Sequence, residues 1–205
     1  MTIDDFDAVT HWDARHTGTE DIGLSWYEQR PTTSLELIDM LIPATGTSVI
    51  DVGGGVSHLA ENLARAGRSV TVLDVSAAAI DLSRKRTAGL DGIDWVTADI
   101  RTWEPDRTWD LWHDRALLHF LTDDEDRRRY GETLRSALRP GGAFVLAAFA
   151  EDGPTHCSGL EVRRHSAADM RAVVPDADVV DERVTVHVTP AGAEQRFRWL
   201  AGRLR

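Results

Sequence analysis

Short stretches of β-branched and other apolar residues alternate along most of the chain with longer amphipathic stretches. The apolar stretches predict strands, and the amphipathic stretches predict helices. The predicted strands are 48–52, 69–73, 93–97, 109–113 and 143–149. The predicted helices are 33–42, 58–66, 77–87 and 122–138. Strands that alternate with helices in this way indicate a parallel sheet with helices on both faces.

Local signals mark where three of these helices should begin. Thr33 and Glu36 have the spacing of a capping box, and so do Thr122 and Glu125. We therefore expect Thr33 and Thr122 to be the N-cap residues of their helices. Ser76 is expected to cap the helix over 77–87.

The last part of the chain has a different pattern. A short helix over 166–174 precedes two strands, 178–188 and 194–200, which Thr189-Pro-Ala-Gly192 joins as a hairpin. The predicted fold class is α/β: a doubly wound, mostly parallel, seven-stranded Rossmann-like sheet that ends in an antiparallel hairpin strand. No stretch rich in Pro, Gly or Ser divides the 205 residues, so we expect one domain over 1–205. It would consist of a cap or lid (1–30), a core (31–150), and a loop with the C-terminal hairpin (151–205).

Composition and charge limit the classes of partner and the cellular compartment that we expect. Hydrophobic residues make up 42% of the chain and charged residues 28%, as in ordinary globular proteins. The net charge of −11 argues against a nucleic-acid partner, and no apolar run is long enough for a membrane span. The acidic start does not resemble a signal peptide, and Cys157 is the single cysteine. We therefore expect a cytoplasmic protein without disulfides or a cysteine-built zinc site, whose oligomeric state the sequence leaves open.

A glycine-rich turn follows the first predicted strand. Asp51 precedes Gly53, Gly54 and Gly55, and the next helix begins shortly afterwards. Gly53 permits a tight turn, and Gly55 lets the backbone approach a ligand closely. The dinucleotide pattern G-x-G-x-x-G is not met, because His58 occupies its last position. A carboxylate at position 51 would repel phosphate but suits a ligand with an ammonium group.

A second acidic residue, Asp74, ends the second strand, where a carboxylate can accept both hydroxyls of a ribose. Together with Ala98-Asp99-Ile100 and Leu138-Arg-Pro-Gly-Gly142, these residues resemble the class I S-adenosylmethionine-dependent methyltransferases over roughly residues 45–150. One departure is Ser57, where that family often has a third glycine.

The resemblance implies a set of cofactor contacts. Asp51 would lie near the methionine ammonium, and Gly53, Gly54 and Gly55 would line the cofactor. Asp74 would hold the ribose, and Val75 would flank the adenine. Asp99 would reach the adenine amino group, with Ile100 packed on the ring. His113 and Asp114 would lie beside the methionine end.

The segment before the core has a narrower similarity. His11-Trp12-Asp-x-Arg15 and Ser25-Trp26-Tyr27 are similar to the N-terminal segment of thiopurine- and thiol-type methyltransferases, which folds over the cofactor. Trp12 and Trp26 are therefore candidate cofactor contacts, because aromatic faces attract a positively charged sulfur. The alternative is that this segment only packs on the sheet.

The acceptor side carries weaker signals. His119 follows the fourth strand, where it could face the substrate as a catalytic residue or be structural. The loop after the fifth strand, 151–160, is the expected acceptor wall, because ligands bind outside the carboxyl ends of parallel strands. The histidines lack the i,i+4 spacing of helical metal ligands, so no metal site is expected. Methyl transfer needs no nucleophilic cysteine, and none is assigned to Cys157.

The leading hypothesis is methyl transfer from S-adenosylmethionine to a small-molecule acceptor, with a thiol or another soft nucleophile favoured. His113-Asp-Arg-Ala116 stands where DNA amino-methyltransferases have an Asn/Asp-Pro-Pro-Tyr/Phe motif, which also argues against nucleic acid. A protein-lysine methyltransferase and a non-catalytic S-adenosylmethionine-binding module are the alternatives. A nicotinamide oxidoreductase is a minor one.

Overall fold

The computed structural model describes residues 7–17, 23–43 and 45–205. Within them, a seven-stranded sheet has the order β3-β2-β1-β4-β5-β9-β8, and a short hairpin pairs β6 with β7. The strands are β1 (Ser48–Val52), β2 (Ser69–Asp74), β3 (Ile93–Thr97), β4 (Trp109–Arg115), β5 (Leu138–Phe149), β6 (His156–Cys157), β7 (Leu160–Glu161), β8 (Ala177–Val188) and β9 (Glu194–Leu204). The helices are α1 (Ala8–His16), α2 (Thr32–Leu41), α3 (Leu59–Arg65), α4 (Ala77–Arg86), the 3₁₀ turn η3 (Leu118–Phe120), α5 (Asp124–Ala137) and α6 (Ala167–Val173).

The strand order creates a switch point beside β1. β1 pairs in parallel with β2 on one side and with β4 on the other, so the chain leaves the centre of the sheet in two directions. β4 and β5 are parallel, whereas β9 runs antiparallel to β5 and to β8. The predicted fold class, with its terminal hairpin, is confirmed. A crevice at the carboxyl ends of β1 and β4 is the usual ligand site of such sheets.

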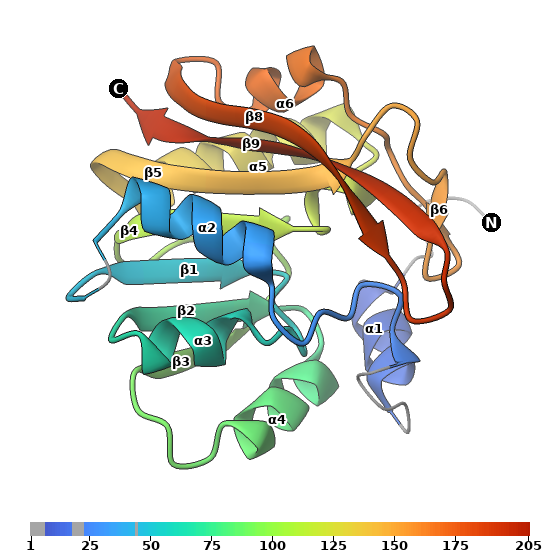
Figure 1. Cartoon of the computed structure of the whole chain (residues 1–205), viewed down its shortest axis with the longest axis horizontal. Coiled ribbons are helices and arrows are strands. Elements are labelled where there is room, and N and C mark those ends of the chain that lie inside the picture. Colours follow the sequence, from blue (N-terminus) through green and yellow to red (C-terminus); the bar gives the residue numbers. More distant parts are fainter. Residues whose placement is uncertain (1–6, 18–22, 44) are drawn as a thin grey trace.

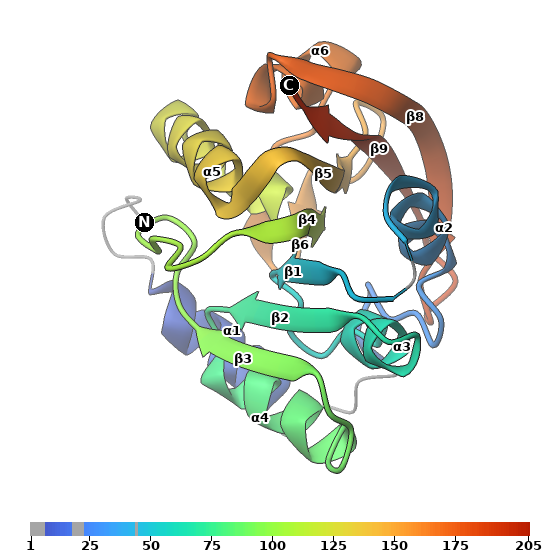
Figure 2. The same cartoon turned by 90° about the vertical axis from the view of Figure 1, so that its left-hand side faces the viewer.

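The core forms on both faces of the sheet. Figure 2 shows α2 and α3 on one face and α5 and α6 on the other. Leu37 of α2 and Leu63 of α3 are fully buried in the first core cluster. Tyr130 and Leu134 of α5 are buried in the second, together with Trp112 of β4. The central strands are thus apolar on both sides, as parallel strands covered by helices must be.

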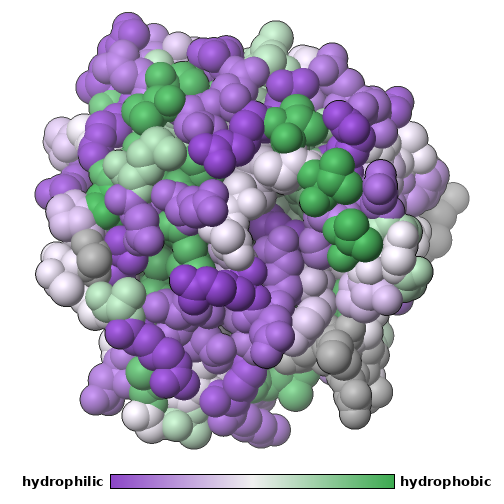
Figure 3. Space-filling view, viewed as in Figure 1, coloured by the Kyte–Doolittle hydropathy of each residue, from purple (hydrophilic) through white to green (hydrophobic). Residues whose placement is uncertain are grey.

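The hairpin β8–β9 closes one edge of the sheet (Figure 1). β8 is an edge strand, and its outward residues include the exposed valines Val180, Val184, Val186 and Val188. Figure 3 shows separate apolar groups among mostly hydrophilic ones on this side of the molecule. Glu182 falls between two of these valines on the same exposed side. A charge there interrupts the apolar row, as is common on edge strands.

The structure corrects two of the expected helix starts. α2 begins at Thr32 after Pro31 and has no side-chain cap, so Thr33 lies inside the helix. The N-cap of α5 is Asp123, whose carboxylate accepts from the backbone N–H of Glu125 and Asp126. Aspartate caps at least as well as threonine, so the neighbour of Thr122 takes the position.

The structure confirms one further local prediction and corrects another. Ser76 caps α4 as predicted, and its hydroxyl accepts from the backbone N–H of Ala79. β5 begins at Leu138 rather than at Ala143, because a register shift against β4 carries Pro140 and the following glycines into the strand. The short hairpin β6–β7 was not predicted.

Candidate functional site

A cavity of about 320 Å³ lies at the carboxyl ends of the central strands. One half of its lining comes from the glycine turn and the ends of β1, β2 and β4. The other half comes from η3, β5, β9 and the β6–β7 hairpin. α1 and the segment before α2 also line it, so parts of the chain far apart in sequence meet there. All predicted site residues except Asp114 line this cavity.

Asp51 is buried at the end of β1 and holds β4 and α2 in place through His113. One carboxylate oxygen of Asp51, Oδ1, accepts a hydrogen bond from His113 Nδ1 at 2.7 Å. The other ring nitrogen, Nε2, lies 2.9 Å from the hydroxyl oxygen of Ser34 on α2. Asp51 Oδ2 has no partner among the described residues, although it is buried. An unpaired buried carboxylate oxygen that lines a cavity suits a cationic ligand group such as an ammonium.

The glycine turn leaves room beside both carboxylates. Gly53 and Gly55 have positive φ values of 68° and 42°, which other residues rarely adopt. A Cβ on Gly54 would lie 2.6 Å from Asp51 Oδ2, and one on Gly55 would lie 3.0 Å from Asp74 Oδ2. Gly54 and Gly55 therefore keep the space in front of the two carboxylates open.

Asp74 ends β2 in an acidic environment. Its carboxylate accepts from the backbone N–H of Ser76 at 2.8 Å. Burial, opposed by its backbone hydrogen bonds and aided by the nearby charges of Asp51 and Asp13, raises the pKa of Asp74 to about 6. A carboxylate in this position can accept two hydroxyl groups of one ligand, as the ribose assignment requires.

The predicted adenine-side residues also line the cavity. Asp99 is held by Arg101, whose Nε lies 3.0 Å from each carboxylate oxygen. Although burial raises the pKa of Asp99, the hydrogen bonds from Arg101 lower it overall. Ile100 is buried and offers an apolar face, and Val75 lies half-buried after Asp74. This wall suits a flat ring with a hydrogen-bond donor at its edge.

Asp114 is the predicted residue that the structure does not bring to the cavity. Because side chains alternate along a strand, His113 faces the cavity and Asp114 faces α5. Its carboxylate accepts from the Tyr130 hydroxyl at 2.6 Å and from the backbone N–H of Leu117 at 2.9 Å. The Tyr130 hydroxyl in turn accepts from Trp112 Nε1 at 2.9 Å. Asp114 thus fixes α5 and the turn after β4, and the expected place beside the methionine end is corrected.

The second half of the cavity is walled by aromatic rings. Trp12 packs edge-on against Trp26 and Phe120, with ring centroids 6.1 and 5.0 Å apart. His119 stacks on Phe149 at 4.3 Å, and Phe149 contacts Phe197 at 4.9 Å. The rings come from α1, the segment before α2, η3, β5 and β9, so only the fold brings them together.

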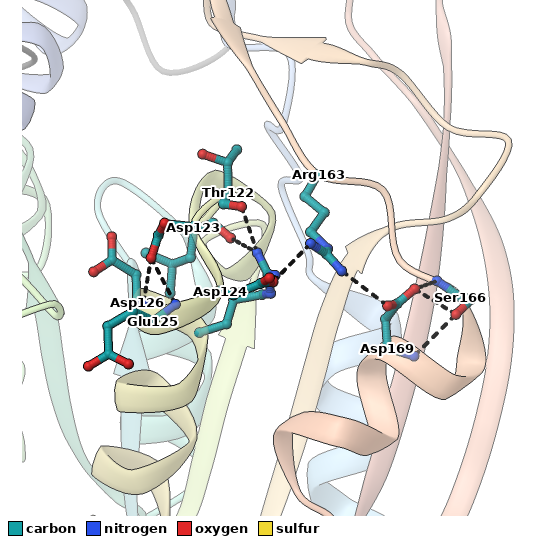
Figure 4. A network of polar contacts seen from close by, with 10 residues as sticks. Thr122, Asp123, Asp124, Glu125, Asp126, Arg163, Ser166 and Asp169 are labelled. Atoms are coloured by element: carbon teal, nitrogen blue, oxygen red, sulfur yellow. Dashed lines mark hydrogen bonds and ion pairs between the residues drawn. The ribbon is translucent and has the colours of Figure 1, made fainter. Parts of the chain in front are cut away.

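His119 is fully buried within this wall. Burial lowers the pKa of His119 to about 3, with smaller contributions from His165 and Arg115, so the ring is neutral near pH 7. Its position is fixed from outside by Arg163, whose backbone N–H donates to the His119 carbonyl oxygen at 2.8 Å. The guanidinium of Arg163 bridges Asp124 of α5 and Asp169 of α6, each at 3.3 Å (Figure 4).

The N-terminal segment is tied over the cavity by polar contacts. On α1, Asp13 Oδ1 accepts from the Ser76 hydroxyl at 2.7 Å and from the backbone N–H of Ala78 at 3.1 Å. Arg115, at the end of β4, donates to the Trp26 carbonyl oxygen at 3.0 Å and pairs with Glu28 at 3.1 Å. From β8, His187 Nε2 bonds the carbonyl oxygen of Ser25 at 2.8 Å.

Sequence reasoning missed several residues that build the site. Ser34, Phe149 and Phe197 carry no motif, because their roles depend on neighbours far away in the chain. Arg115 had one usable signal, since a charged residue at the carboxyl end of a buried strand usually meets a ligand or a counter-charge.

Two features are absent from the described residues. Within residues 7–17, 23–43 and 45–205, no group of three or more His, Cys, Asp or Glu side chains could hold a metal ion. No helix of that same part of the chain is long and apolar enough to cross a membrane.

Comparison with known proteins shows similarity to methyltransferases over the middle of the chain. Residues 49–142 match the family model described as a methyltransferase domain. An uncharacterized methyltransferase of Mycobacterium tuberculosis is 34% identical over 114 residues, which are 55% of this chain and 56% of that protein. Nodulation protein S of Sinorhizobium fredii is 31% identical over 100 residues, or 49% of this chain and 46% of that protein. The chain thus spans about half the length of the curated relatives it matches.

A solved structure extends the likeness in fold to nearly the whole chain. N-methyltransferase NodS from Bradyrhizobium japonicum, in complex with S-adenosylhomocysteine, has a TM-score of 0.77 at 18% identity and covers 97% of this chain and 99% of its own. The chain therefore contains a stretch, residues 49–142, that matches a methyltransferase domain, as its motifs predict, and it shares its fold with NodS, which binds S-adenosylhomocysteine. The narrower similarity to thiol-type enzymes stays a prediction.

A substitution at Gly55 tests the cofactor surface. Gly55→Ala and Gly89→Ala both force a residue with a Cβ to a positive φ, but open space surrounds only Gly89. Each should lower the free energy of unfolding by about 1–2 kcal/mol. Only Gly55→Ala should weaken S-adenosylmethionine binding in calorimetry, by about tenfold or more. Equal affinities in the two variants would show that Gly55 does not line the cofactor.

The pH dependence of cofactor affinity tests Asp74. If the ionised carboxylate binds the ribose, protonation below its pKa of about 6 competes with binding. The affinity for S-adenosylmethionine should rise from pH 5 to pH 7 by about tenfold and then level off. In the Asp74→Asn variant the affinity should be lower and flat over this range. A wild-type affinity that is also flat would refute the assignment.

Proposed function

We propose that the chain transfers a methyl group from S-adenosylmethionine to a small-molecule acceptor. One observation carries the proposal: a single cavity joins the carboxylates of Asp51 and Asp74 to a half walled by aromatic rings. The first half suits a ligand with an ammonium group and a ribose. The second leaves an apolar space for another molecule beside it, which brings two reactants together.

The residues at hand fit the cofactor. Asp51 Oδ2 would accept from the methionine ammonium, and Asp74 would accept from the ribose hydroxyls. Asp99, Val75 and Ile100 would hold the adenine. When bound, S-adenosylmethionine supplies an electrophilic methyl group on a positively charged sulfur. Trp12 and Trp26 would attract that charge with their faces and exclude water.

The acceptor half favours a nucleophile that needs little help from a base. His119 is the catalytic candidate there, and in its neutral form it can hydrogen-bond an acceptor. A histidine whose pKa is about 3 is a weak base, so an alcohol would gain little from it. A thiol or another soft nucleophile fits this condition. Because NodS, which shares the fold, is an N-methyltransferase, a neutral nitrogen nucleophile is the nearest competitor.

Charge supports a small molecule over a macromolecule. The net charge is −11, and the acidic residues Asp123, Asp126 and Glu161 line the cavity. A nucleic-acid backbone would be repelled there. The single cysteine, Cys157, is free and buried, which fits the reducing cytoplasm that we propose as its compartment. Cell fractionation with an antibody against the chain would check that location.

Product formation tests the activity. The purified chain should convert S-adenosylmethionine to S-adenosylhomocysteine when incubated with a panel of small thiols, amines and phenols, as measured by liquid chromatography. Asp74→Ala should reduce turnover at low cofactor concentration, because two charge-assisted bonds of about 1.5–3 kcal/mol each would be lost in part. Tritium transfer to lysate proteins instead would favour the protein-lysine alternative. Cofactor binding without product from any acceptor class would favour a non-catalytic binding module.

A lid role for residues 1–30 is tested at its docking contact. Asp13→Ala removes the acceptor for Ser76 and Ala78, whereas Asp13→Asn keeps an oxygen in place. The alanine variant should bind S-adenosylmethionine about tenfold more weakly and turn over more slowly, with a small change in melting temperature. The asparagine variant should behave nearly as the wild type. If Asp13→Ala lowers the melting temperature and leaves turnover intact, the segment only packs on the core.

A further inference from the structure

The aromatic wall is continuous from the N-terminal segment to the terminal hairpin. Successive centroid distances of 6.1, 5.0 and 4.5 Å link Trp26, Trp12, Phe120 and His119. Distances of 4.3 and 4.9 Å continue the series through Phe149 to Phe197. Such a wall offers ring faces and edges, which prefer flat aromatic partners in offset or edge-on contact.

One polar group in this wall lacks the partners that a buried group requires. His119 is fully buried and lines the cavity, yet neither Nδ1 nor Nε2 has a hydrogen-bond partner among the described residues. A neutral imidazole has one N–H donor and one acceptor lone pair, so both functions are unused. Buried polar groups in folded proteins are nearly always paired, and an unpaired one that borders a cavity points to a ligand.

The positive charge beside this wall is already neutralised. Arg115 lies 5.0 Å over the Phe197 ring, but it pairs with Glu28 at 3.1 Å and donates to the Trp26 carbonyl oxygen. The other polar groups on this side include the uncharged thiol of Cys157 and amide of Gln195 and the carboxylate of Glu161. A negatively charged ligand would lose its hydration there and would meet a carboxylate instead of a free positive charge.

We propose that the acceptor is a planar aromatic or heteroaromatic molecule without a negative charge, which lies against this ring wall and is oriented by a hydrogen bond from its edge to the His119 ring. The inference rests on the proposed methyltransferase function and adds the class of the acceptor. His119 acts on this view as a specificity residue that touches the acceptor. It selects molecules with a hydrogen-bonding edge over purely apolar ones.

Binding of simple probes tests the class without requiring turnover. The full chain, saturated with S-adenosylhomocysteine, is titrated with 2-naphthol, naphthalene, decahydro-2-naphthol and 2-naphthoate, and dissociation constants are measured by ligand-observed NMR. We expect 2-naphthol to bind at least tenfold more tightly than the saturated alcohol and the carboxylate. Equal or tighter binding of either of these two would overturn the proposal.

Two matched variants test the hydrogen bond to His119. His119→Phe keeps an aromatic ring and removes both nitrogens. It should therefore weaken the binding of 2-naphthol at least fivefold and leave the binding of naphthalene unchanged. His165 is also fully buried with both nitrogens unpaired among the described residues, but it does not line the cavity. His165→Phe should therefore change neither probe. If His119→Phe weakens the binding of both probes, or of neither, the proposed role of His119 is overturned.

A separate measurement keeps this inference distinct from the proposed function. S-adenosylmethionine affinity is determined by calorimetry for the wild type and for both variants, and it should be the same in all three. A wild type that binds the cofactor but not 2-naphthol refutes the acceptor class and leaves the methyltransferase proposal standing. A wild type that binds 2-naphthol but not the cofactor refutes the function on which the inference rests.

Discussion

A buried carboxylate needs a partner, and Asp51 has one for only one of its two oxygens. His113 supplies that partner and thereby locks β4 beside β1 at the switch point, while its other nitrogen reaches Ser34 on α2. The second oxygen of Asp51 remains directed at a space that Gly54 must leave open, since a Cβ there would collide with it. The position of the glycine turn, the seating of α2 and the polarity of the cofactor half all follow from this one carboxylate.

The two faces of β4 have different roles: one face lines the cavity, and the other packs against α5. His113 and Arg115 point to the cavity, where they hold Asp51 and the N-terminal segment. Trp112 and Asp114 point to the other face, where they anchor Tyr130 of α5. A slip of one residue in the pairing of β4 would exchange these sets, so the register of a single strand decides whether the cavity receives its polar groups.

The parts of the site that a local pattern specifies could be predicted from the sequence. Asp51, the glycine turn and Asp74 follow from strand ends and turn chemistry, and the doubly wound, mostly parallel sheet follows from the alternation of apolar and amphipathic stretches. Asp114 was misplaced because a motif gives the position along a strand but not the face. Phe149 and Phe197 look like ordinary core residues until β9 pairs with β5. The helix caps at Pro31 and Asp123 differ from the expected ones because neighbouring residues compete for the same place.

The two halves of the cavity are encoded largely in different stretches of the chain. Asp51, Asp74 and Asp99 fall within the stretch that matches the methyltransferase domain, residues 49–142. Of the aromatic wall, Trp12, Trp26, Phe149 and Phe197 fall outside this stretch, whereas His119 and Phe120 fall inside it. The ends of the chain can therefore diverge while the middle is preserved. A lineage that exchanged only its terminal segments would keep the site for its methyl donor and acquire a site for a different acceptor. Such a small fold could thus change its substrate without changing the central strands of its sheet.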